Sequence, residues 1–391
     1  YSDEQGPLTS AYLREAYELG AREFDWEAKM ARSGEQNGSK VIGVGVGQAF
    51  HSGGSNGFDG LVRLTPDGVV HIHSGVGNLG TYSYAGTSRV VAEVLQCDWE
   101  RCVIHRGDSR EHLPWNLGQF GSNTSFTMTR SNHAAAIDLK NKLLELAAID
   151  FGGNAEDYDI DGERVFSKAD PAQGMTYGEA AERAIDIGGK FAGHALADDM
   201  FFMTKASATA VAGTGLVGAA KDNYDKNGVV PALAVGYMMV ELDLETGMYE
   251  ILEYQATADC GTVIHPQGLA AQIRGGGVMG IGMATLERVV YDPSSGLPAN
   301  TGLYQAKPPS YLDVPSKMLV AAVNQPDPQN PIGAKGIGEP LMGCAATALL
   351  CAISDAMGGH YFNRTPVVPD MIVNAVAGKP QSHGNLQVNT F

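Results

Sequence analysis

Alternating apolar and small or polar residues predict short strands in two separate stretches of the chain. In the first stretch we expect strands at 41–50, 60–65 and 69–74, then a helix at 84–95 and a strand at 102–105. Asp67 and Gly68, between the second and third strands, are typical of a hairpin turn. The hairpin is thus expected to lead through a glycine-rich loop, 75–80, into the helix.

The second stretch repeats this scheme. We expect strands at 231–244 and 248–256, a loop at 259–268 that contains glycine and proline, and a helix at 269–286. Gly247 occupies the second turn as Gly68 occupies the first. The repeat predicts an α+β fold with two lobes, each built on a hairpin-loop-helix unit.

The remaining segments are predicted from helical periodicity and turn residues. A helix is expected within 8–30, and Ser131 is a candidate N-cap of a long helix that follows an irregular stretch. Thr176 and Glu179 have the spacing of a capping box. Residues 150–175 are expected to form a surface excursion, and 294–330 a proline-rich loop. We divide the chain into a helical arm (1–40), a first lobe (41–225) and a second lobe (226–391).

Charge and cysteine content narrow the function classes. The net charge of −17 argues against nucleic acid and anionic membranes as partners. No apolar run approaches the roughly 20 residues of a membrane span. The five cysteines form no Cys-x-x-Cys pair, so we expect no zinc or iron–sulfur ligand set in this chain. Their sparse, odd number fits a reducing compartment, and we expect a cytoplasmic protein.

The segment 333–340, Gly-Ala-Lys-Gly-Ile-Gly-Glu-Pro, carries the strongest chemical signal. Pro340 suits the first turn of a helix, because its missing N–H is not needed there. Glu339 is then expected at a helix N-terminus, beside bare glycine backbone, where a lone carboxylate can act as a general base. A purely structural capping glutamate is the alternative interpretation of these eight residues.

Two other loops are candidates for binding. Residues 75–80 match Gly-x-Gly-x-x-Gly between a strand and a helix, as in a dinucleotide site. The acid expected after the next strand is poorly placed, since Glu93 lies within the helix and Asp108 comes late. Binding of a phosphate or pterin by the loop backbone at the helix N-terminus is therefore the favoured interpretation, and a nicotinamide-dependent dehydrogenase is an alternative. Residues 118–125 are rich in hydroxyl and amide groups that can bind an anion or a polar ring edge. A solvated loop is the alternative, and these residues alone favour it.

The histidines predict no metal site. We interpret His71 and His73 as strand residues whose imidazoles face opposite sides, and His105 as isolated. The two strand histidines therefore cannot chelate one metal, and we expect packing and surface roles for them.

In their order along the chain, these segments resemble the xanthine dehydrogenase, or molybdenum hydroxylase, family. The resemblance runs from about residue 41 to 359 and is to the C-terminal half of the molybdopterin-binding subunit. Its most specific motif is the segment 333–340, which follows the hairpin turn, the loops 75–80 and 118–125, and Gln272 on a helix.

The resemblance implies roles for individual residues. Glu339 matches the active-site base, while the metal is carried by the pterin rather than by the protein. The implied cofactor-binding residues are Leu79, Gly80, Thr81, Gly121, Ser122, Asn123, Thr124, Gln272, Lys335, Gly336 and Gly338. This chain departs from the family at Thr81, where glutamine is usual, and at Arg274, where glutamate is common.

The resemblance also implies partners. This sequence contains no counterpart of the family's other cofactor-binding half, nor of its iron–sulfur and flavin domains. A partner chain is expected to carry that half, with iron–sulfur clusters and FAD on further subunits. The implied reaction is hydroxylation of an N-heterocycle, aldehyde or aromatic substrate with oxygen from water. Alternatives are reductive dehydroxylation resembling 4-hydroxybenzoyl-CoA reductase, hydration, or a non-catalytic scaffold half. The cytosine dinucleotide form of the pterin, and tungsten in place of molybdenum, are left open.

Overall fold

The computed structural model describes residues 6–225 and 227–381, which form two compact units that alternate along the chain. Unit 1 comprises 1–10, 53–230 and 326–336, and unit 2 comprises 11–52, 231–325 and 337–391. This division differs from the predicted consecutive ranges of an arm and two lobes. The reason is strand pairing, because β2 (Lys40–Ser52) pairs with β10 (Pro231–Asp243) along its full length and so belongs to unit 2.

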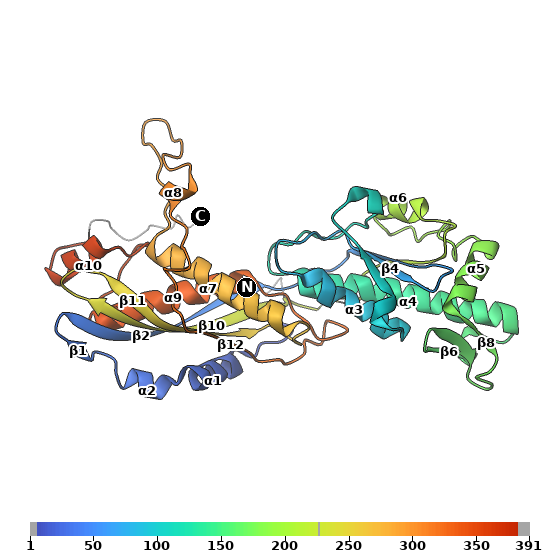
Figure 1. Cartoon of the computed structure of the whole chain (residues 1–391), viewed down its shortest axis with the longest axis horizontal. Helices are drawn as coiled ribbons and strands as arrows, with labels where there is room; N and C mark the ends of the chain where they lie inside the picture. The colour runs from blue at the N-terminus through green and yellow to red at the C-terminus, as the bar shows by residue number, and fades with distance from the viewer. Residues whose placement is uncertain (1–5, 226, 382–391) are drawn as a thin grey trace. The chain divides into compact units, whose positions relative to one another are not determined.

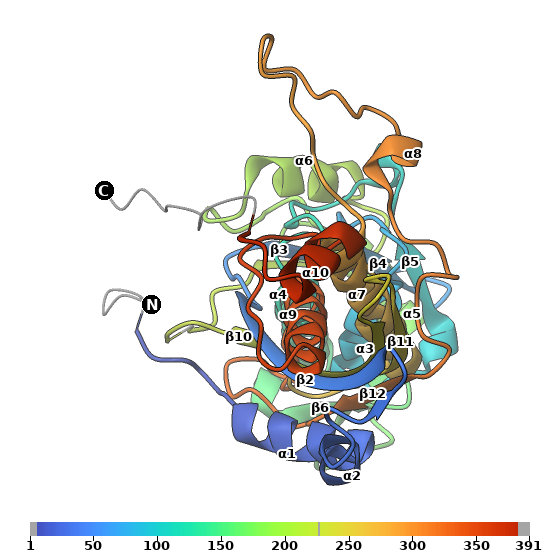
Figure 2. The same cartoon turned by 90° about the vertical axis from the view of Figure 1, so that its left-hand side faces the viewer.

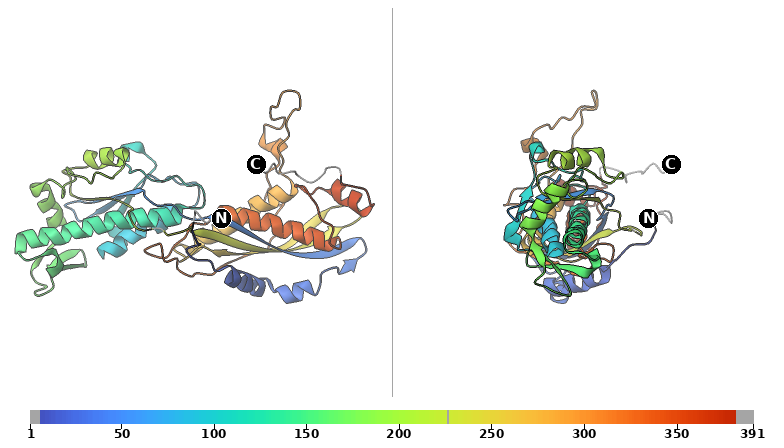
Figure 3. Two further views of the ribbon diagram at one scale, coloured as in Figure 1. Left: turned by 180° about the vertical axis from the view of Figure 1, so that it is seen from behind. Right: turned by 90° about the vertical axis from the view of Figure 1, so that its right-hand side faces the viewer.

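In the described residues, the main sheet of unit 1 has the strand order β5-β4-β3-β9. Its strands are β3 (Asp59–Leu64), β4 (Val70–His73), β5 (Cys102–His105) and β9 (Leu216–Lys221). The helices of this unit are α3 (Ser83–Leu95), α4 (Thr124–Phe151), α5 (Tyr177–Ile187) and α6 (Phe202–Ala210), and 3-10 turns lie at Trp99–Arg101, Ser109–Glu111 and Ala155–Asp157. A smaller sheet of β6 (Tyr158–Asp161), β7 (Arg164–Ser167) and β8 (Gly174–Thr176) packs beside the C-terminal part of α4 (Figure 3).

Unit 2 has a curved sheet of order β1-β2-β10-β11-β12 (Figure 1). The further strands are β1 (Gln36–Asn37), β11 (Tyr249–Asp259) and β12 (Met318–Ala322). Its helices are α1 (Leu13–Phe24), α2 (Trp26–Met30), α7 (Pro266–Thr285), α8 (Leu303–Ala306), α9 (Glu339–Ala356) and α10 (Pro369–Val376). One face of the sheet packs against α9 and the other against α1 (Figure 2).

The strand β2 shows how its sequence allows this packing. Successive side chains point to opposite faces of a strand. Ile42 and Val44 face the α1 side, where they join Val235 and Tyr237 of β10. The glycines at 43, 45 and 47 face α9, and a Cβ at Gly43 would lie 2.0 Å from a backbone oxygen of that helix. The glycine repeat therefore lets α9 rest directly on the sheet.

The predicted duplication extends further than hairpin, loop and helix. In unit 1 the hairpin β3–β4 is followed by α3 and by β5, which pairs parallel to β4. In unit 2 the hairpin β10–β11 is followed by α7 and by β12, which pairs parallel to β11. In each sheet a further strand pairs antiparallel with the first strand of the hairpin, β9 in unit 1 and β2 in unit 2. A long helix packs on each sheet, α4 in unit 1 and α9 in unit 2. The two long helices begin at Thr124 and Glu339, which therefore hold equivalent places in the two folds.

Several predicted elements need correction. The long helix α4 begins at Thr124 rather than after Ser131, which is buried inside it. The predicted surface excursion at 150–175 contains the strands β6, β7 and β8, and the predicted proline-rich loop at 294–330 contains α8 and β12. Other predictions are confirmed, among them the β3–β4 hairpin with Gly68 at φ 78° and the capping box of Thr176 and Glu179. No helix in the described residues is both long enough and apolar enough to cross a membrane.

Candidate active site

The N-terminus of α9 carries the predicted base. Glu339 is the first residue of the helix and Pro340 the second, as the sequence predicts. Glu339 is half-buried and is the acidic residue of the first turn, whereas Leu341 and Cys344 behind it are fully buried. The unpaired N–H groups and the dipole at such a helix end favour a carboxylate over a neutral side chain.

Gln272 lies on α7, which packs beside α9 within unit 2. A Cβ at Gly276 would meet Leu341, and one at Gly280 would meet the carbonyl of Met342. These contacts advance in the same direction along both helices. Gln272, one turn before Gly276, is therefore on the side of α7 that leads toward the start of α9.

In unit 1, the loop that ends at α4 contacts the segment that carries Lys335 and Gly336. Ser122 and Asn123 are both buried, and Asn123 is the N-cap residue of α4. A Cβ at Gly336 would lie 1.7 Å from the carbonyl oxygen of Ser122, and Gly336 donates its N–H to Gly53 at 2.8 Å. Only glycine fits at 336, so the structure brings these two predicted cofactor segments together.

A second contact, which the sequence analysis missed, fixes the loop with Leu79, Gly80 and Thr81. Gln119 donates through Nε2 to Thr81 Oγ1 at 2.9 Å and to Ser83 Oγ at 2.6 Å. Its Oε1 accepts the N–H of Leu79 at 2.7 Å. Thr81 stands where glutamine is usual in the family. Gln119 thus brings an amide group to this position through its hydrogen bond to Thr81. The Gly118-Gln119-Phe120 run was visible in the sequence, but its partner loop was not.

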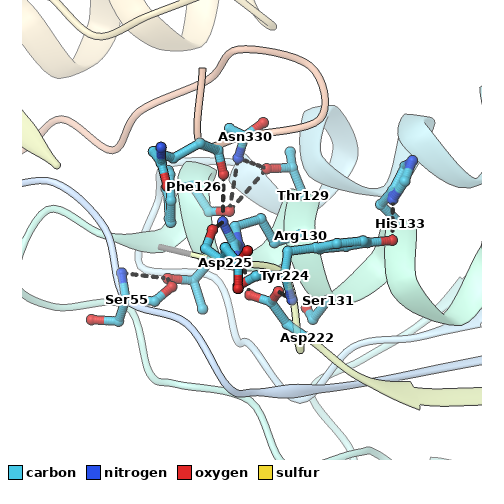
Figure 4. A network of polar contacts seen from close by, with 12 residues as sticks. Ser55, Phe126, Thr129, Arg130, Ser131, His133, Asp222, Tyr224, Asp225 and Asn330 are labelled. Atoms are coloured by element: carbon cyan, nitrogen blue, oxygen red, sulfur yellow. Dashed lines mark hydrogen bonds and ion pairs between the residues drawn. The ribbon is translucent and has the colours of Figure 1, made fainter. Parts of the chain in front are cut away.

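A buried ion pair holds the segment that precedes Lys335 (Figure 4). Arg130 Nε donates to Asp222 Oδ2 at 2.7 Å, and both side chains are fully buried. The guanidinium also donates to the carbonyls of Tyr224, Asp225 and Gln329. Beside it, Asn330 donates to the carbonyl of Phe126 at 3.0 Å and to Thr129 Oγ1 at 2.7 Å. The first turns of α4 are thereby joined to residues 329–330.

The histidine predictions require a correction. His71 and His73 are two residues apart in β4, and residues i and i+2 lie on the same face of a strand. His105 on the adjacent β5 stacks on His73 and contacts His71 Nδ1 through Nε2 at 2.8 Å. Burial lowers the pKa of His71 to about 4 and that of His73 to about 3. No group of three or more His, Cys, Asp or Glu in the described residues is arranged to hold a metal ion.

Comparison with known proteins identifies the fold. The family model for the molybdopterin cofactor-binding domain matches residues 19–315, roughly three quarters of the chain. The chain belongs to this family.

Relatives of this molybdopterin-binding chain confirm the resemblance to molybdenum hydroxylases. The gamma subunit of the 6-hydroxypseudooxynicotine dehydrogenase complex of Paenarthrobacter nicotinovorans is 29% identical, over 94% of this chain and 43% of that protein. The xanthine dehydrogenase molybdenum-binding subunit of Escherichia coli O157:H7 is 26% identical, over 94% of this chain and 47% of that protein. The chain thus spans less than half the length of these relatives.

Solved structures agree in fold. Quinoline 2-oxidoreductase from Pseudomonas putida 86 superposes with a TM-score of 0.77 and 25% identity, covering 95% of this chain and 46% of that one. The Cu,Mo-CO dehydrogenase superposes with a TM-score of 0.75 at 21% identity, covering 95% of this chain and 46% of that one. The mixed helix-and-sheet architecture is therefore that of molybdenum-cofactor-binding domains.

The residues present fit a molybdopterin. A Cβ at Gly77, Gly80 or Gly275 would meet no heavy atom within 4 Å, so a ligand can approach the α-carbons closely at these places. The hydroxyl and amide groups at 122–124 stand at the N-terminus of α4, which favours a phosphate group. The individual binding roles of these residues remain predictions.

The dinucleotide interpretation fits less well. Gly75–Gly80 does lie between β4 and α3, and β5 is parallel to β4. However, β5 ends at His105 rather than at an acid that could bind a ribose hydroxyl. The sheet is also mixed, since β3 pairs antiparallel with both β4 and β9.

Proposed function

We propose that this chain is the C-terminal half of the catalytic subunit of a molybdenum hydroxylase. A partner chain supplies the other cofactor-binding half, and further subunits carry iron–sulfur clusters and FAD in a cytoplasmic complex. The substrate is an N-heterocycle, aldehyde or other aromatic, hydroxylated with oxygen from water. Similarity to proteins named nicotine 6-hydroxylase, quinoline 2-oxidoreductase and aldehyde oxidoreductase supports this substrate class.

The observation that carries the proposal is the position of Glu339. It opens α9 directly after the glycine-rich segment 333–338, in a chain that belongs to the molybdopterin-binding family. Molybdopterin, in its simple or cytosine dinucleotide form, supplies the redox chemistry when bound. The Glu339 carboxylate accepts the proton that the attacking water must lose. The backbone at 121–124, Lys335 and Gln272 hold and orient the cofactor.

Replacing Glu339 with glutamine tests this role. Glu339→Gln keeps the size of the side chain but cannot accept the proton, so we expect turnover to fall by about 10²–10⁴-fold. The molybdenum and pterin contents of the purified complex should not change, because glutamine conserves the size and shape of the side chain. Steady-state turnover, together with metal and pterin analysis of the same preparation, measures both effects.

Asp370→Asn is the matched control. Asp370 is an exposed carboxylate in the first turn of α10, so it undergoes the same chemical change at another helix N-terminus. The control should retain wild-type turnover. If Glu339→Gln turned over substrate as fast as this control, Glu339 would have no part in proton transfer.

A further inference from the structure

An arm projects from unit 2 between α7 and β12 (Figures 1 and 2). We define the arm as residues 287–315, which include α8 (Leu303–Ala306). Its large apolar side chains are unusually exposed. Those with more than 60% of their surface exposed are Val289, Tyr291, Leu297, Leu303, Tyr304, Tyr311 and Leu312.

The arm is shaped by its own polar contacts. Leu297 accepts the N–H of Asp292 at 2.9 Å, and Val290 accepts that of Ala299 at 2.7 Å, which closes a short hairpin. Asn300 accepts the N–H of Val290 at 2.9 Å and donates to the carbonyl of Arg288 at 2.7 Å. These turns set the backbone path without burying the apolar side chains.

The base of the arm is tied to unit 2. A Cβ at Gly282 on α7 would lie 2.6 Å from Pro309 Cδ, so the glycine makes room for the segment that returns from the arm to unit 2. Beyond this contact, Tyr311 and Leu312 stand more than 80% and about 80% exposed, respectively. The arm is therefore held to α7 at Pro309, while large apolar side chains before and after this contact are exposed to solvent.

Such a surface needs a covering partner. Ordering a chain segment costs roughly 1–2 kcal/mol per residue, which is normally offset by burial of apolar area. The three tyrosines alone would bury roughly 150–250 Å² each, a large part of the ~800 Å² per partner of a stable interface. Exposed patches of this kind mark interaction sites, and tyrosine is enriched among residues that dominate binding energy.

The length of the relatives provides a candidate for the polypeptide that covers the arm. The match runs through residue 315, so the arm belongs to the family domain. The relatives carry more than half of their length outside the region that this chain spans. The arm has three acidic and two basic residues, whereas the chain as a whole has a net charge of −17. The arm is thus nearly neutral, and we expect apolar contacts rather than charge pairs to dominate its binding.

We infer that the arm docks onto the polypeptide that corresponds to the rest of the relatives' length, through an apolar face on that polypeptide. The inference rests on the proposed function, in which a partner chain supplies that half. Tyr304, Tyr311 and Leu312 are the anchors, since together with Leu303 they are the most exposed large side chains of the arm.

Co-purification of the native complex tests the inference. The complex is captured through a tag on this chain, and its subunits are identified by mass spectrometry. A variant with Tyr304→Ser, Tyr311→Ser and Leu312→Ser should retain at least tenfold less of the partner that carries the missing half. All three side chains are already solvent-exposed, so the melting temperature of the isolated variant chain should match that of the wild type.

Met248→Ser with Phe202→Ser is the matched control. Both residues are exposed apolar side chains outside the arm, so this variant should keep the partner. If the wild-type chain co-purified with no such partner, the proposed function itself would fail. If the arm variant kept the partner as well as the control does, only the arm inference would fail. An arm-dependent dimer of this chain, or arm-dependent binding of the isolated chain to phosphatidylcholine vesicles, would assign the surface to another occupant.

Discussion

At the scale of single residues, some side chains of the site could be predicted from the sequence and others could not. Glu339 and Pro340 were predictable because a proline in the first helical turn and an acid before it form a local pattern. Gln119 was not, because its hydrogen bonds reach 36–40 residues back along the chain to Leu79, Thr81 and Ser83. A single sequence does not report such contacts.

Gln119 is expected to position the loop 79–83. Gln119→Leu removes three hydrogen bonds, each worth about 0.5–1.5 kcal/mol, so we expect cofactor occupancy to fall on the order of tenfold. Pterin and molybdenum per purified chain measure the change, with the exposed Gln173→Leu as control. In combination with Thr81→Val the losses should be less than additive, since both variants break the same bond. Full occupancy in Gln119→Leu would show that the contact does not hold the loop.

The buried His73 and the half-buried His71 predict that unit 1 loses stability in acid. The pKa of His73 is about 3 and that of His71 about 4, both below the ordinary 6.5 because of burial. The unfolded chain therefore takes up protons below pH 6.5 that the folded chain does not, and stability falls as the pH decreases toward 4. Arg63 and His105 disfavour the charged forms further, while Asp67 opposes this effect at His71 and a hydrogen bond to Glu111 opposes it at His73.

Urea unfolding at pH 7 and pH 4.5 measures this dependence. His73→Gln should reduce the loss of stability between the two pH values by as much as a few kcal/mol. The exposed His194→Gln should leave it unchanged. Equal losses in wild type and His73→Gln would mean that other groups cause the acid sensitivity.

At the scale of elements, local patterns predicted most strands but not every helix boundary. The strand β2 was evident because apolar residues alternate with glycine over 41–47. The start of α4 was missed because Thr124, Ser125 and Thr127 read as a loop, whereas tertiary packing buries Phe126 and Arg130 there. The strand β12 was missed because a five-residue run among prolines carries little signal, and its pairing with β11 is tertiary.

The Arg130–Asp222 pair is expected to hold α4 to the segment before Lys335. Asp222→Asn leaves the guanidinium buried without its counter-charge, so unfolding stability should fall by about 3–5 kcal/mol. Glu145→Gln, which breaks an exposed pair with Lys190 in the same unit, should cost less than about 1 kcal/mol. Chemical denaturation of both variants measures the difference. Equal effects would contradict a structural role for the buried pair.

At the scale of the whole molecule, the duplication explains why the candidate residues fall where they do. Each unit places a glycine-rich loop before a long helix, and these helices begin at Thr124 and Glu339. The repeat of hairpin, loop and helix could be predicted from turn glycines and apolar patterns. The alternation of the two units along the chain could not, because it depends on β2 pairing with β10 some 190 residues later.

Metal and pterin analysis of the native complex tests the central claim most directly. The account predicts stoichiometric molybdenum, or tungsten in its place, and a pterin released on denaturation. Both should be present in a complex that contains this chain and the missing half. Substrate turnover at the native rate by a preparation that contains neither metal nor pterin would contradict the account.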